Sequence, residues 1–596
     1  MSTRDGSIPG EAFIFGGMTP TEIRDQLDRI LTSRSFRNST RLQGLLRFAV
    51  ECTLKGDTEQ LKEPVLAQKV FARGSDTGAR SSSTVRLELQ RLRRRLREYY
   101  DIEGGLDPVV ITFPFGCCVP SFDHASHDQP LFEPLGPGRL DSSTVAVLPF
   151  RNFSPEEDQD YFCDGITEDI IHALSSIAGL KVIGRTSSFT FRNSALDPRA
   201  IGLRLGAGTL LGGSVRKLGP RLKISAEMIN AEHGQVEWSE VFDTPLGDIF
   251  TVQEEIAQSI SSMLQVRLSP GRVGKLARGA PDVDAYLLYL KARQAWNLMN
   301  VESYRSAIRL FENAVGLYPA YAAPYAGLAD AYIYLALWGG AKPREVFPEA
   351  KHAAREALRL DPNAAHAYAS LAAVTLFNDW RWGESVELAK QGMDLEPCYG
   401  FGQHVLGACL LAGGQHQEAL ACFETAVHLD PLSLRANRSL GWAHYMLRQY
   451  QSAERWLRAA IVLDSNSVET RYVLGSLFLC QGRLQDAWDQ ALHCQKRPPD
   501  PHALALTGAC HARLGHKEAA LGAISELSDI SAAGYIDPHC IGQIYLGLED
   551  YDRALDSVHR SVFEHTPAAA FLNLDPQFDA LHADPGFAAL AAPLRR

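Results

Sequence analysis

The 596-residue sequence predicts a multidomain protein with an N-terminal α+β head, a central α/β domain and a C-terminal all-α solenoid of helix pairs. Three observations predict this arrangement. The C-terminal half repeats itself every 34 residues, the middle alternates apolar strand patterns with short helices, and the N-terminal part ends in an arginine-rich amphipathic helix followed by a hairpin pattern. The length alone leaves room for several hydrophobic cores.

The 34-residue period organises the C-terminal half. Small residues recur at fixed offsets: Gly407, Gly441 and Gly475 in the first helix of each unit, and Ala419, Ala453 and Ala487 in the second. Small side chains let two helices approach closely, and a proline such as Pro431 ends the second helix. These units resemble tetratricopeptide repeats, which implies a surface that binds a protein or peptide. We expect seven or eight units in residues 281–596, with the nine extra residues between Pro319 and Pro362 in a lengthened turn at 339–343.

Residues 1–19 are expected to be a flexible N-terminus, and residues 20–122 predict a small α+β domain. Thr19-Pro20 is typical of a helix start, because threonine caps a helix and proline suits its first position. The expected elements are helices beginning at Pro20 and Ser39, helices over 62–71 and 84–100, and strands over 109–113 and 117–120. Helices, then a cationic amphipathic helix, then a hairpin follow the element order of a winged helix.

The predicted helix over 84–100 carries an apolar and a cationic stripe. The apolar residues recur at helical spacing, which predicts a buried face: Val85, Leu89, Leu92, Leu96 and Tyr99. In a winged helix the cationic face lies in the major groove, where arginines bind base edges and phosphates. The residues predicted to contact DNA are Ser83, Arg86, Gln90, Arg93, Arg94 and Arg97. The alternative is an arginine-rich face that meets only solvent.

The run Arg91–Leu96, with Gly116 in the hairpin that follows, resembles the effector domains of OmpR/ToxR-type transcriptional activators. It is also similar to the head of bacterial proteins that join such a domain to a TolB-like domain and tetratricopeptide repeats. The resemblance implies a DNA-binding winged helix in which the hairpin contacts the phosphate backbone.

Residues 142–270, after a linker of residues 123–141, predict an α/β domain. The expected strands span 144–150, 181–183, 209–216, 222–229 and 237–242, and the expected helices span 164–174, 199–205 and 248–266. Five segments in order resemble the TolB N-terminal-like domain: 147–150, 161–165, 184–189, 213–216 and 238–240. Relatives with this domain are sometimes named adenylate cyclase-like, because a class III cyclase domain accompanies it in other bacterial proteins. Residues 1–140 are too short for that catalytic domain and lack its paired aspartates.

We expect no catalytic site, no cofactor and no metal site. Asp164, Glu168 and Asp169 are interpreted as acids at a helix start, which the helix dipole favours. The glycines between 206 and 213 precede a strand, whereas a phosphate-binding loop precedes a helix. The His-Cys neighbours of the repeats lack the short ligand pairs of a zinc site: 493–494, 510–511 and 539–540.

Composition sets the remaining limits. A net charge of -11 argues against a protein that coats nucleic acid with its whole surface, although a small basic head remains compatible. The 11 cysteines show no CxxC pair, which is typical of free thiols in a reducing cytoplasm. No apolar run reaches the roughly 20 residues of a membrane span. These features predict a cytoplasmic protein without a membrane partner.

The sequence therefore predicts a bacterial, cytoplasmic one-component transcriptional regulator. It would bind DNA through the winged helix and a protein or peptide partner through the repeats. The alternative is an interaction scaffold or signalling adaptor that does not bind DNA, and a third class is an enzyme with an unrecognised site. The sequence leaves open the operator, the partner, activation or repression, the oligomeric state and any ligand of the TolB-like domain.

Overall fold

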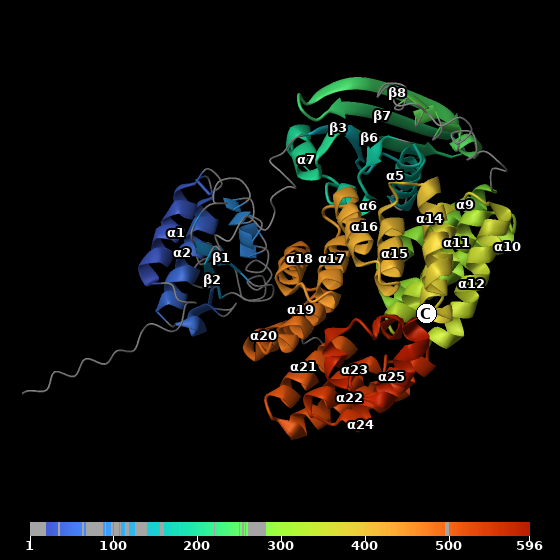
Figure 1. Ribbon diagram of the computed structural model, residues 1–596. Coiled ribbons are helices and arrows are strands. Elements are labelled where there is room, and N and C mark those ends of the chain that lie inside the picture. The colour runs from blue at the N-terminus through green and yellow to red at the C-terminus, as the bar shows by residue number, and fades with distance from the viewer. Residues whose placement is uncertain are drawn as a thin grey trace, which may run out of the picture. The chain divides into compact units, whose positions relative to one another are not determined.

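The computed structural model of the protein describes residues 19–33, 36–37, 39–55, 57–61, 65–66, 88–89, 91–93, 95–96, 99–100, 107, 109–113, 119–124, 140–154, 160–177, 179–194, 196–219, 221–249, 251–252, 255–256, 258–259, 282–494, 500–533 and 535–595. The chain divides into two units, residues 1–132 and 133–596. The elements are labelled in Figure 1.

The first unit packs helices around a two-stranded antiparallel sheet. Its elements are α1 (Pro20–Thr32), α2 (Thr40–Leu54), the 3₁₀ turn η1 (Thr58–Leu61), β1 (Val109–Thr112) and β2 (Ser121–His124). The predicted start of α1 is confirmed, since Thr19 accepts from the amide of Glu22 and Glu22 accepts from the amide of Thr19. The predicted apolar stripe is also confirmed where it is described, because Leu89, Leu92, Leu96 and Tyr99 are all buried.

The second strand of the hairpin lies later than the predicted span of 117–120. It begins at Ser121 and pairs Ile111 with Phe122 and Thr112 with Ser121. This register buries both Ile111 and Phe122 in the core of the unit, which explains why the strand forms at 121–124 instead of 117–120. The predicted linker of 123–141 is correspondingly shorter at both ends, since β2 ends at His124 and the next strand begins at residue 141.

A six-stranded sheet begins the second unit. Its elements are β3 (Asp141–Val147), β4 (Arg151–Asn152), α5 (Asp160–Ser175), β5 (Lys181–Val182), α6 (Arg185–Phe189), α7 (Pro198–Leu205), β6 (Ala207–Leu218), β7 (Arg221–Asn230), β8 (Gln235–Pro245) and the 3₁₀ turn η2 (Leu246–Asp248). The strand order is β5-β3-β6-β7-β8, with β4 paired to β6. β3 runs parallel to β5 and β6, whereas β6, β7 and β8 form an antiparallel meander.

The two faces of this sheet carry separate cores. Val145 and Val147 point toward α5, whereas Ala146 packs on the side of α7, as the alternation of a strand requires. Five predicted elements are confirmed with longer spans, namely α5, α7, β6, β7 and β8. β3 is shifted from the predicted 144–150 to 141–147, and β5 is one residue shorter than predicted. α6 was not among the predicted elements. Ile249, Val252 and Ile256 of the predicted helix over 248–266 are buried, and most of that helix lies outside the described residues.

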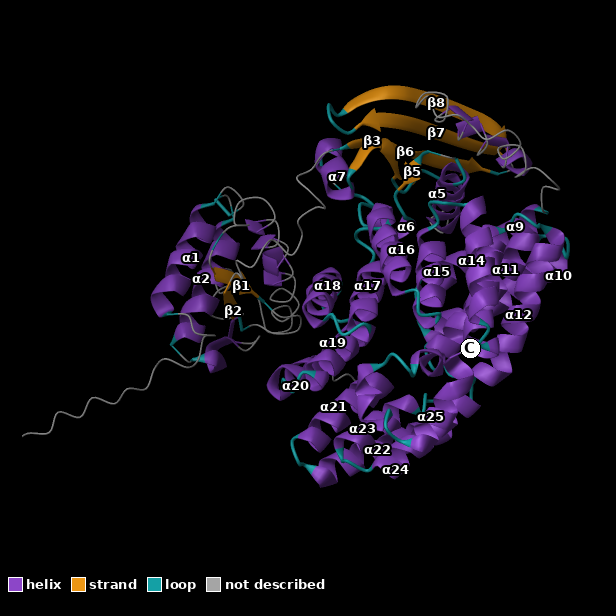
Figure 2. Ribbon diagram, viewed as in Figure 1, coloured by secondary structure: helices purple, strands orange, loops and turns teal. Residues whose placement is uncertain are grey.

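The rest of the described chain is helical (Figure 2). Eight consecutive pairs occupy residues 283–563: α9 (Val283–Trp296) and α10 (Val301–Leu317), α11 (Ala322–Leu337) and α12 (Pro343–Leu360), α13 (Ala365–Val374) and α14 (Trp382–Leu395), α15 (Gly400–Ala412) and α16 (His416–Leu429), α17 (Leu434–Met446) and α18 (Tyr450–Leu463), α19 (Val468–Cys480) and α20 (Leu484–His493), α21 (Pro501–Arg513) and α22 (Lys517–Ala533), α23 (His539–Gly547) and α24 (Tyr551–Phe563). Short turns follow: η4 (Pro567–Phe571), η5 (Pro576–Leu581), α25 (Pro585–Ala591) and η6 (Ala592–Arg595).

The predicted role of the small residues is confirmed. A Cβ atom on Gly407 would lie 3.0 Å from the Phe423 ring, and one on Gly441 would lie 2.8 Å from Leu457. The prediction that the extra residues between Pro319 and Pro362 lie in a lengthened turn is wrong for most of them. α11 has 16 residues where α15 has 13, and α12 has 18 where α16 has 14. The apolar stripes of α11 and α12 continue through these extra turns and make longer helices stable.

The third pair contains a further insertion. α13 continues into a π-helical turn, η3 (Thr375–Asp379), before α14 begins. A π turn accommodates an added residue inside a helix without changing the packing on either side of it. None of the helices described in the structure is long and apolar enough to cross a membrane.

Candidate functional site

Of the six residues predicted to contact DNA, the structure describes Arg93. Its Nε donates to the main-chain oxygen of Phe113 at 2.9 Å, which ties the helix to the end of β1. Arg91 forms an ion pair with Glu88 at 2.7 Å. Ser83, Arg86, Gln90, Arg94 and Arg97 lie outside the described residues, so DNA binding by this face stays a prediction.

A cavity of about 310 Å³ lies inside the second unit, between the α/β domain and the repeats. The α/β domain lines it with α5, α6 and the end of β5. α5 and α6 lie between the sheet and the repeat helices in Figure 1. The opposite wall comes mainly from the first helices of successive pairs, α9, α11, α13, α15 and α17. The α/β domain therefore covers the surface that these first helices share.

Asp430 anchors the short helix α6 to the repeats. It belongs to the Leu-Asp-Pro sequence at the end of α16, and its carboxylate accepts from the Ser187 amide at 2.7 Å and from the Ser187 hydroxyl at 2.5 Å. The Gly184 amide donates to the oxygen of Leu429 at 2.6 Å. A Cβ on Gly184 would lie 2.6 Å from the Asp430 carboxyl carbon, so the close approach requires glycine.

Glu168 forms the second contact between the domain and the repeats. Its buried carboxylate pairs with Arg185 of α6 and with Arg293 of α9 at 3.3 Å, and it accepts from Asn297 at 3.0 Å. Burial raises the pKa of Glu168, but the guanidinium groups of Arg185 and Arg293 outweigh burial and hold that pKa below its ordinary value.

The interpretation of Asp164, Glu168 and Asp169 as acids at a helix start is wrong. α5 begins at Asp160, so these residues lie beyond its first turn. Each has a specific partner: Arg192 binds Asp164, the two arginines bind Glu168, and the hydroxyl of Tyr286 donates to Asp169 at 2.6 Å. These contacts join α5 to α6 within the domain and to α9 of the repeats.

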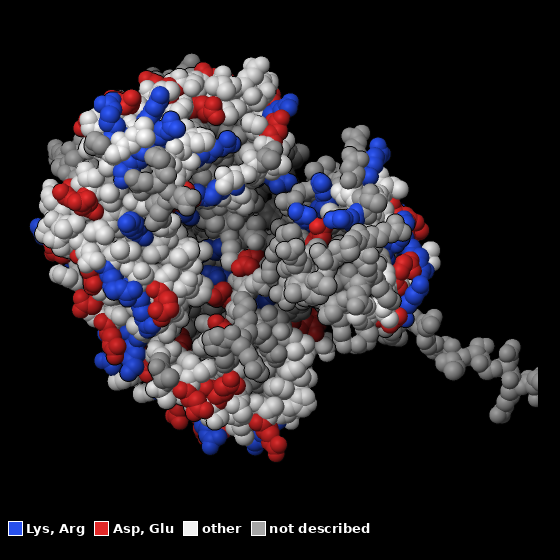
Figure 3. Space-filling model, turned by 180° about the vertical axis from the view of Figure 1, so that it is seen from behind, with Lys and Arg blue, Asp and Glu red and all other residues white. Residues whose placement is uncertain are grey.

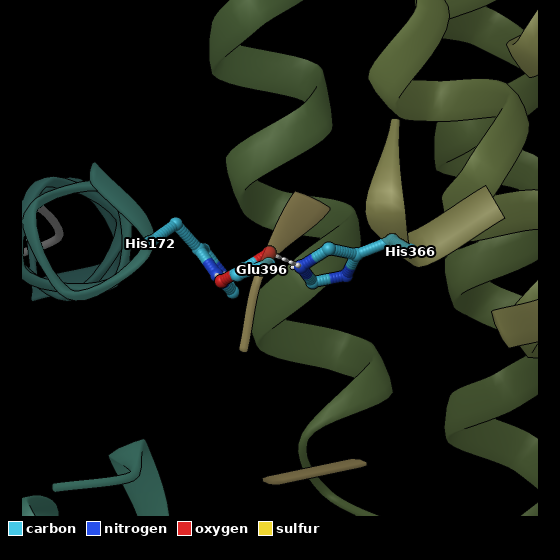
Figure 4. A group of neighbouring side chains, drawn as sticks. All are labelled: His172, His366 and Glu396. Atoms are coloured by element: carbon cyan, nitrogen blue, oxygen red, sulfur yellow. Dashed lines mark hydrogen bonds and ion pairs between the residues drawn. The ribbon is translucent and has the colours of Figure 1, made fainter. Parts of the chain in front are cut away.

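Two histidines and a glutamate among the residues that line the cavity point toward one another (Figure 4). His172 comes from α5, His366 from α13, and Glu396 from the residue after α14. His172 Nδ1 lies 3.2 Å from Glu396 Oε1 and 3.3 Å from His366 Nε2, and His366 Nε2 lies 3.7 Å from Glu396 Oε2. We call these three residues the His-His-Glu cluster.

Burial acts on both imidazoles of the cluster. It lowers the pKa of His172, but the Glu396 carboxylate outweighs burial and the pKa lies above its ordinary value. Burial and the neighbouring His172 hold the pKa of His366 well below its ordinary value. The carboxylate thus favours the charged form of His172, whereas burial favours the neutral form of His366.

Arg435 of α17 lies on the far side of the cavity among aromatic rings. Its guanidinium carbon is 4.8 Å from the centre of the Tyr334 ring and 5.5 Å from that of the Trp296 ring. Its Nη1 atom donates to the Tyr334 hydroxyl at 2.9 Å. His404 also lines the cavity, and its Nδ1 atom is buried without a hydrogen-bond partner. A guanidinium in the cavity wall can bind an anionic group.

The C-terminal segment covers the next part of the array. The Tyr445 hydroxyl donates to Asp575 at 3.1 Å, and Arg448 pairs with Asp579. The His565 ring stacks on Trp380, beside the π turn, with ring centres 4.4 Å apart. The turns after α24 therefore pack back onto the third and fifth pairs, so the chain covers a second part of its own repeat surface.

Sequence reasoning missed the His-His-Glu cluster and the contacts of Asp430. His172 and His366 are 194 residues apart in the sequence, and Ser187 and Asp430 are 243 apart. A metal motif shows a short pair of ligands, and this cluster has none. The one signal near this contact was Pro431, which was expected to end the second helix and directly follows Asp430.

Comparisons with known proteins agree with the repeat prediction. Residues 409–468 match the family model of the tetratricopeptide repeat. The chain is 38% identical over 232 residues to a Rhizobium meliloti (strain 1021) protein named "Putative adenylate cyclase 3", a match that covers 38% of this chain and 39% of that protein. It is 28% identical over 164 residues to the transcriptional regulator HilA of Salmonella typhimurium, covering 27% and 29% of the two chains. The chain thus matches less than half the length of either relative.

The solved structure of pilF from Pseudomonas aeruginosa is 20% identical to this chain, with a TM-score of 0.27, and the match covers 34% of this chain and 91% of pilF. The family match and the eight helix pairs together identify the C-terminal part as a tetratricopeptide-repeat array. Such repeats indicate protein–protein interaction.

Proposed function

We propose that the protein is a transcriptional regulator that binds DNA through its N-terminal unit and a protein or peptide partner through its repeats. Similarity to the regulator HilA supports a role in transcription, and the repeats support a protein partner. A winged helix in the N-terminal unit and a TolB-like domain after it are part of the proposal, on the residue patterns that resemble those families.

One observation carries the DNA-binding part of the proposal: the buried apolar stripe of the helix that includes Leu89, Leu92, Leu96 and Tyr99. Successive residues of a helix are about 100° apart, so the positions of Arg86, Gln90 and Arg97 fall roughly a third of a turn from the centre of that stripe. Arg94 falls opposite it. Burial of the apolar face therefore favours an outward-facing cationic stripe that can bind phosphates and base edges.

The test is a gel-shift titration of the full chain on genomic fragments of its host. The double variant Arg86→Ala/Arg94→Ala removes two of the proposed contacts, whereas Arg93 is kept because it also binds Phe113. Arg309→Ala/Arg355→Ala is the matched control, since it removes the same charge from exposed positions on the repeats. We expect the control to bind as the wild type does.

The double variant is expected to bind more weakly, with a salt dependence of log K reduced by about 2, because each phosphate contact contributes about 0.9 to that slope. Equal slopes for the two double variants would contradict a phosphate-binding role for Arg86 and Arg94. Absence of binding by the wild type at low salt would favour the adaptor, in which the repeats bind a partner and the N-terminal unit does not bind DNA.

The proposal includes no catalytic activity, although one relative carries the name of an adenylate cyclase. Its support is the sequence pattern, in which residues 1–140 lack paired aspartates in strands. The measurement is cyclic AMP formation from ATP with Mg²⁺ or Mn²⁺ by the purified full chain. Turnover above that of a heat-denatured sample would make the protein an enzyme and overturn this part of the proposal.

A further inference from the structure

The three donor atoms of the His-His-Glu cluster have the spacing of a metal site. Ligands of a tetrahedral zinc ion lie about 2.0–2.1 Å from the metal, which places neighbouring ligand atoms about 3.3 Å apart. His172 Nδ1 lies 3.2 Å from Glu396 Oε1 and 3.3 Å from His366 Nε2, whereas the 3.7 Å distance joins His366 Nε2 to the other carboxylate oxygen, Oε2. One donor atom from each residue lies within 4.8 Å of the other two. An ion between the two ring nitrogens and the carboxylate would contact all three side chains after small rotations of those side chains.

Hydrogen bonding alone does not satisfy this arrangement. His172 Nδ1 faces both Glu396 Oε1 and His366 Nε2, and a ring nitrogen carries at most one proton. If that proton is donated to Glu396, His366 Nε2 receives no separate donor, and its distance of 3.7 Å from Glu396 Oε2 is too long for a hydrogen bond of its own. A cation accepts a lone pair from each of the three side chains at once.

The surroundings hold the ligands and leave one side of the cluster accessible. The His366 ring stacks on Tyr399 with ring centres 4.1 Å apart, which fixes its orientation. The side chains of His172 and His366 are 33% and 22% exposed, and all three residues line the cavity. A fourth ligand, either water or a group of a bound molecule, can therefore reach the metal position from the cavity.

We propose that His172, His366 and Glu396 form a three-ligand site for a divalent cation of the zinc class, which joins the α/β domain to the repeats. Two imidazoles and one carboxylate are the donor set that zinc binds in sites with an open fourth position. One ligand comes from the α/β domain and two come from the repeats, so the ion would link the two parts of the second unit.

The experiment uses the untagged full chain, stripped with a chelator and then titrated with Zn²⁺ alone. Bound zinc is measured by elemental mass spectrometry after gel filtration in buffer without free metal. We expect about one more equivalent of zinc on the wild type than on Glu396→Gln and His366→Ala. His404→Ala is the matched control, since His404 lines the same cavity outside the cluster, and it is expected to keep the full equivalent.

Two readouts distinguish loss of a ligand from loss of the fold. Glu396→Gln preserves the size of the side chain, and its circular dichroism and melting temperature without metal are compared with those of the wild type. Co²⁺ added to the stripped wild type is expected to give the strong visible absorption of a tetrahedral site, and Glu396→Gln is expected to lose that absorption.

The proposal is overturned if the wild type holds no more zinc than Glu396→Gln, or if the cobalt spectrum is that of the hydrated ion. In either case the cluster is an ion pair of His172 and Glu396 with His366 packed beside it. If His366→Ala does not fold, the comparison of the wild type with Glu396→Gln decides the question.

Discussion

The buried ion pair between α5 and α9 offers the sharpest test of how the α/β domain is joined to the repeats. We predict that Glu168→Gln destabilises the second unit by about 3 kcal/mol. The Glu168 side chain is 7% exposed and that of Arg293 is 13% exposed, so the substitution leaves a guanidinium in a buried site without its carboxylate partner. Removal of one partner from a buried pair typically costs about 3–5 kcal/mol.

The lower end of that range applies here. Arg185 also loses its partner, but its side chain is 28% exposed and can recover solvation by turning toward the cavity. The glutamine oxygen still accepts from Asn297 or from one arginine, which retains part of the hydrogen bonding. The surface pair of Arg305 and Glu302 is the control, since both side chains are largely exposed, and Glu302→Gln is expected to change stability by less than about 0.5 kcal/mol.

The assay is urea unfolding of the full chain, followed by circular dichroism and by tryptophan fluorescence, because Trp296 lies beside Arg293. A double-mutant cycle with Arg293→Gln isolates the pair. The double variant is expected to be less destabilised than the sum of the single variants by at least about 1 kcal/mol, because it leaves no unpaired charge on Arg293. A cost below about 0.5 kcal/mol for Glu168→Gln, or strict additivity, would refute the reasoning.

Three further predictions address the repeats. Burial raises the pKa of Asp330 to about 6, above the unfolded value near 3.9. As the pH rises from about 4 to about 6, the wild type should therefore lose stability relative to Asp330→Asn. An equal change of unfolding free energy with pH in the two proteins, measured by urea unfolding, would contradict this prediction. Gly327→Ala places a Cβ 2.4 Å from the Phe311 ring and should destabilise by about 1–3 kcal/mol, whereas Gly316→Ala meets no atom within 4 Å and should be neutral or stabilising in a thermal melt. Asp430→Ala should increase the rate of amide hydrogen exchange in α6 by about tenfold or more, because the Ser187 amide loses its acceptor. Asp464→Ala is the control, since Asp464 is the exposed equivalent one repeat later, and it should leave that rate unchanged.

The parts of the fold that local periodicity determines could be predicted from the sequence. The offset between Gly407 and Gly441 identified the repeats because each unit packs only on its neighbours, so the constraint recurs along the chain. The second strand of the hairpin was misplaced because Phe122 stands alone between Pro120 and polar residues, and no alternation marks so short a strand. Its position depends on pairing with Ile111 in the folded unit.

The candidate site could not be predicted because it forms between elements that are distant in the sequence. Glu168 and Arg293 are 125 residues apart, and the pairing of His172 with His366 depends on how the α/β domain docks on α13. A single sequence carries no signal for such a contact, since each residue alone has an ordinary local role. The predicted DNA contacts have a different status: apart from Arg93, they lie outside the described residues and stay predictions.

The docked α/β domain also changes what the repeats can bind. A peptide that enters the surface shared by α9, α11, α13, α15 and α17 must displace the contacts of Asp430 and Glu168, whereas a partner that binds the second helices of the pairs need not. For the first kind of partner, the measured affinity is reduced by the fraction of molecules in which the domain has moved away. Weakening the contact between the α/β domain and the repeats would therefore strengthen binding of such a peptide. A metal ion in the His-His-Glu cluster would weaken binding of the peptide, because the ion would hold ligands from both sides of that contact. By this argument, partner binding by the repeats and the position of the α/β domain form one equilibrium.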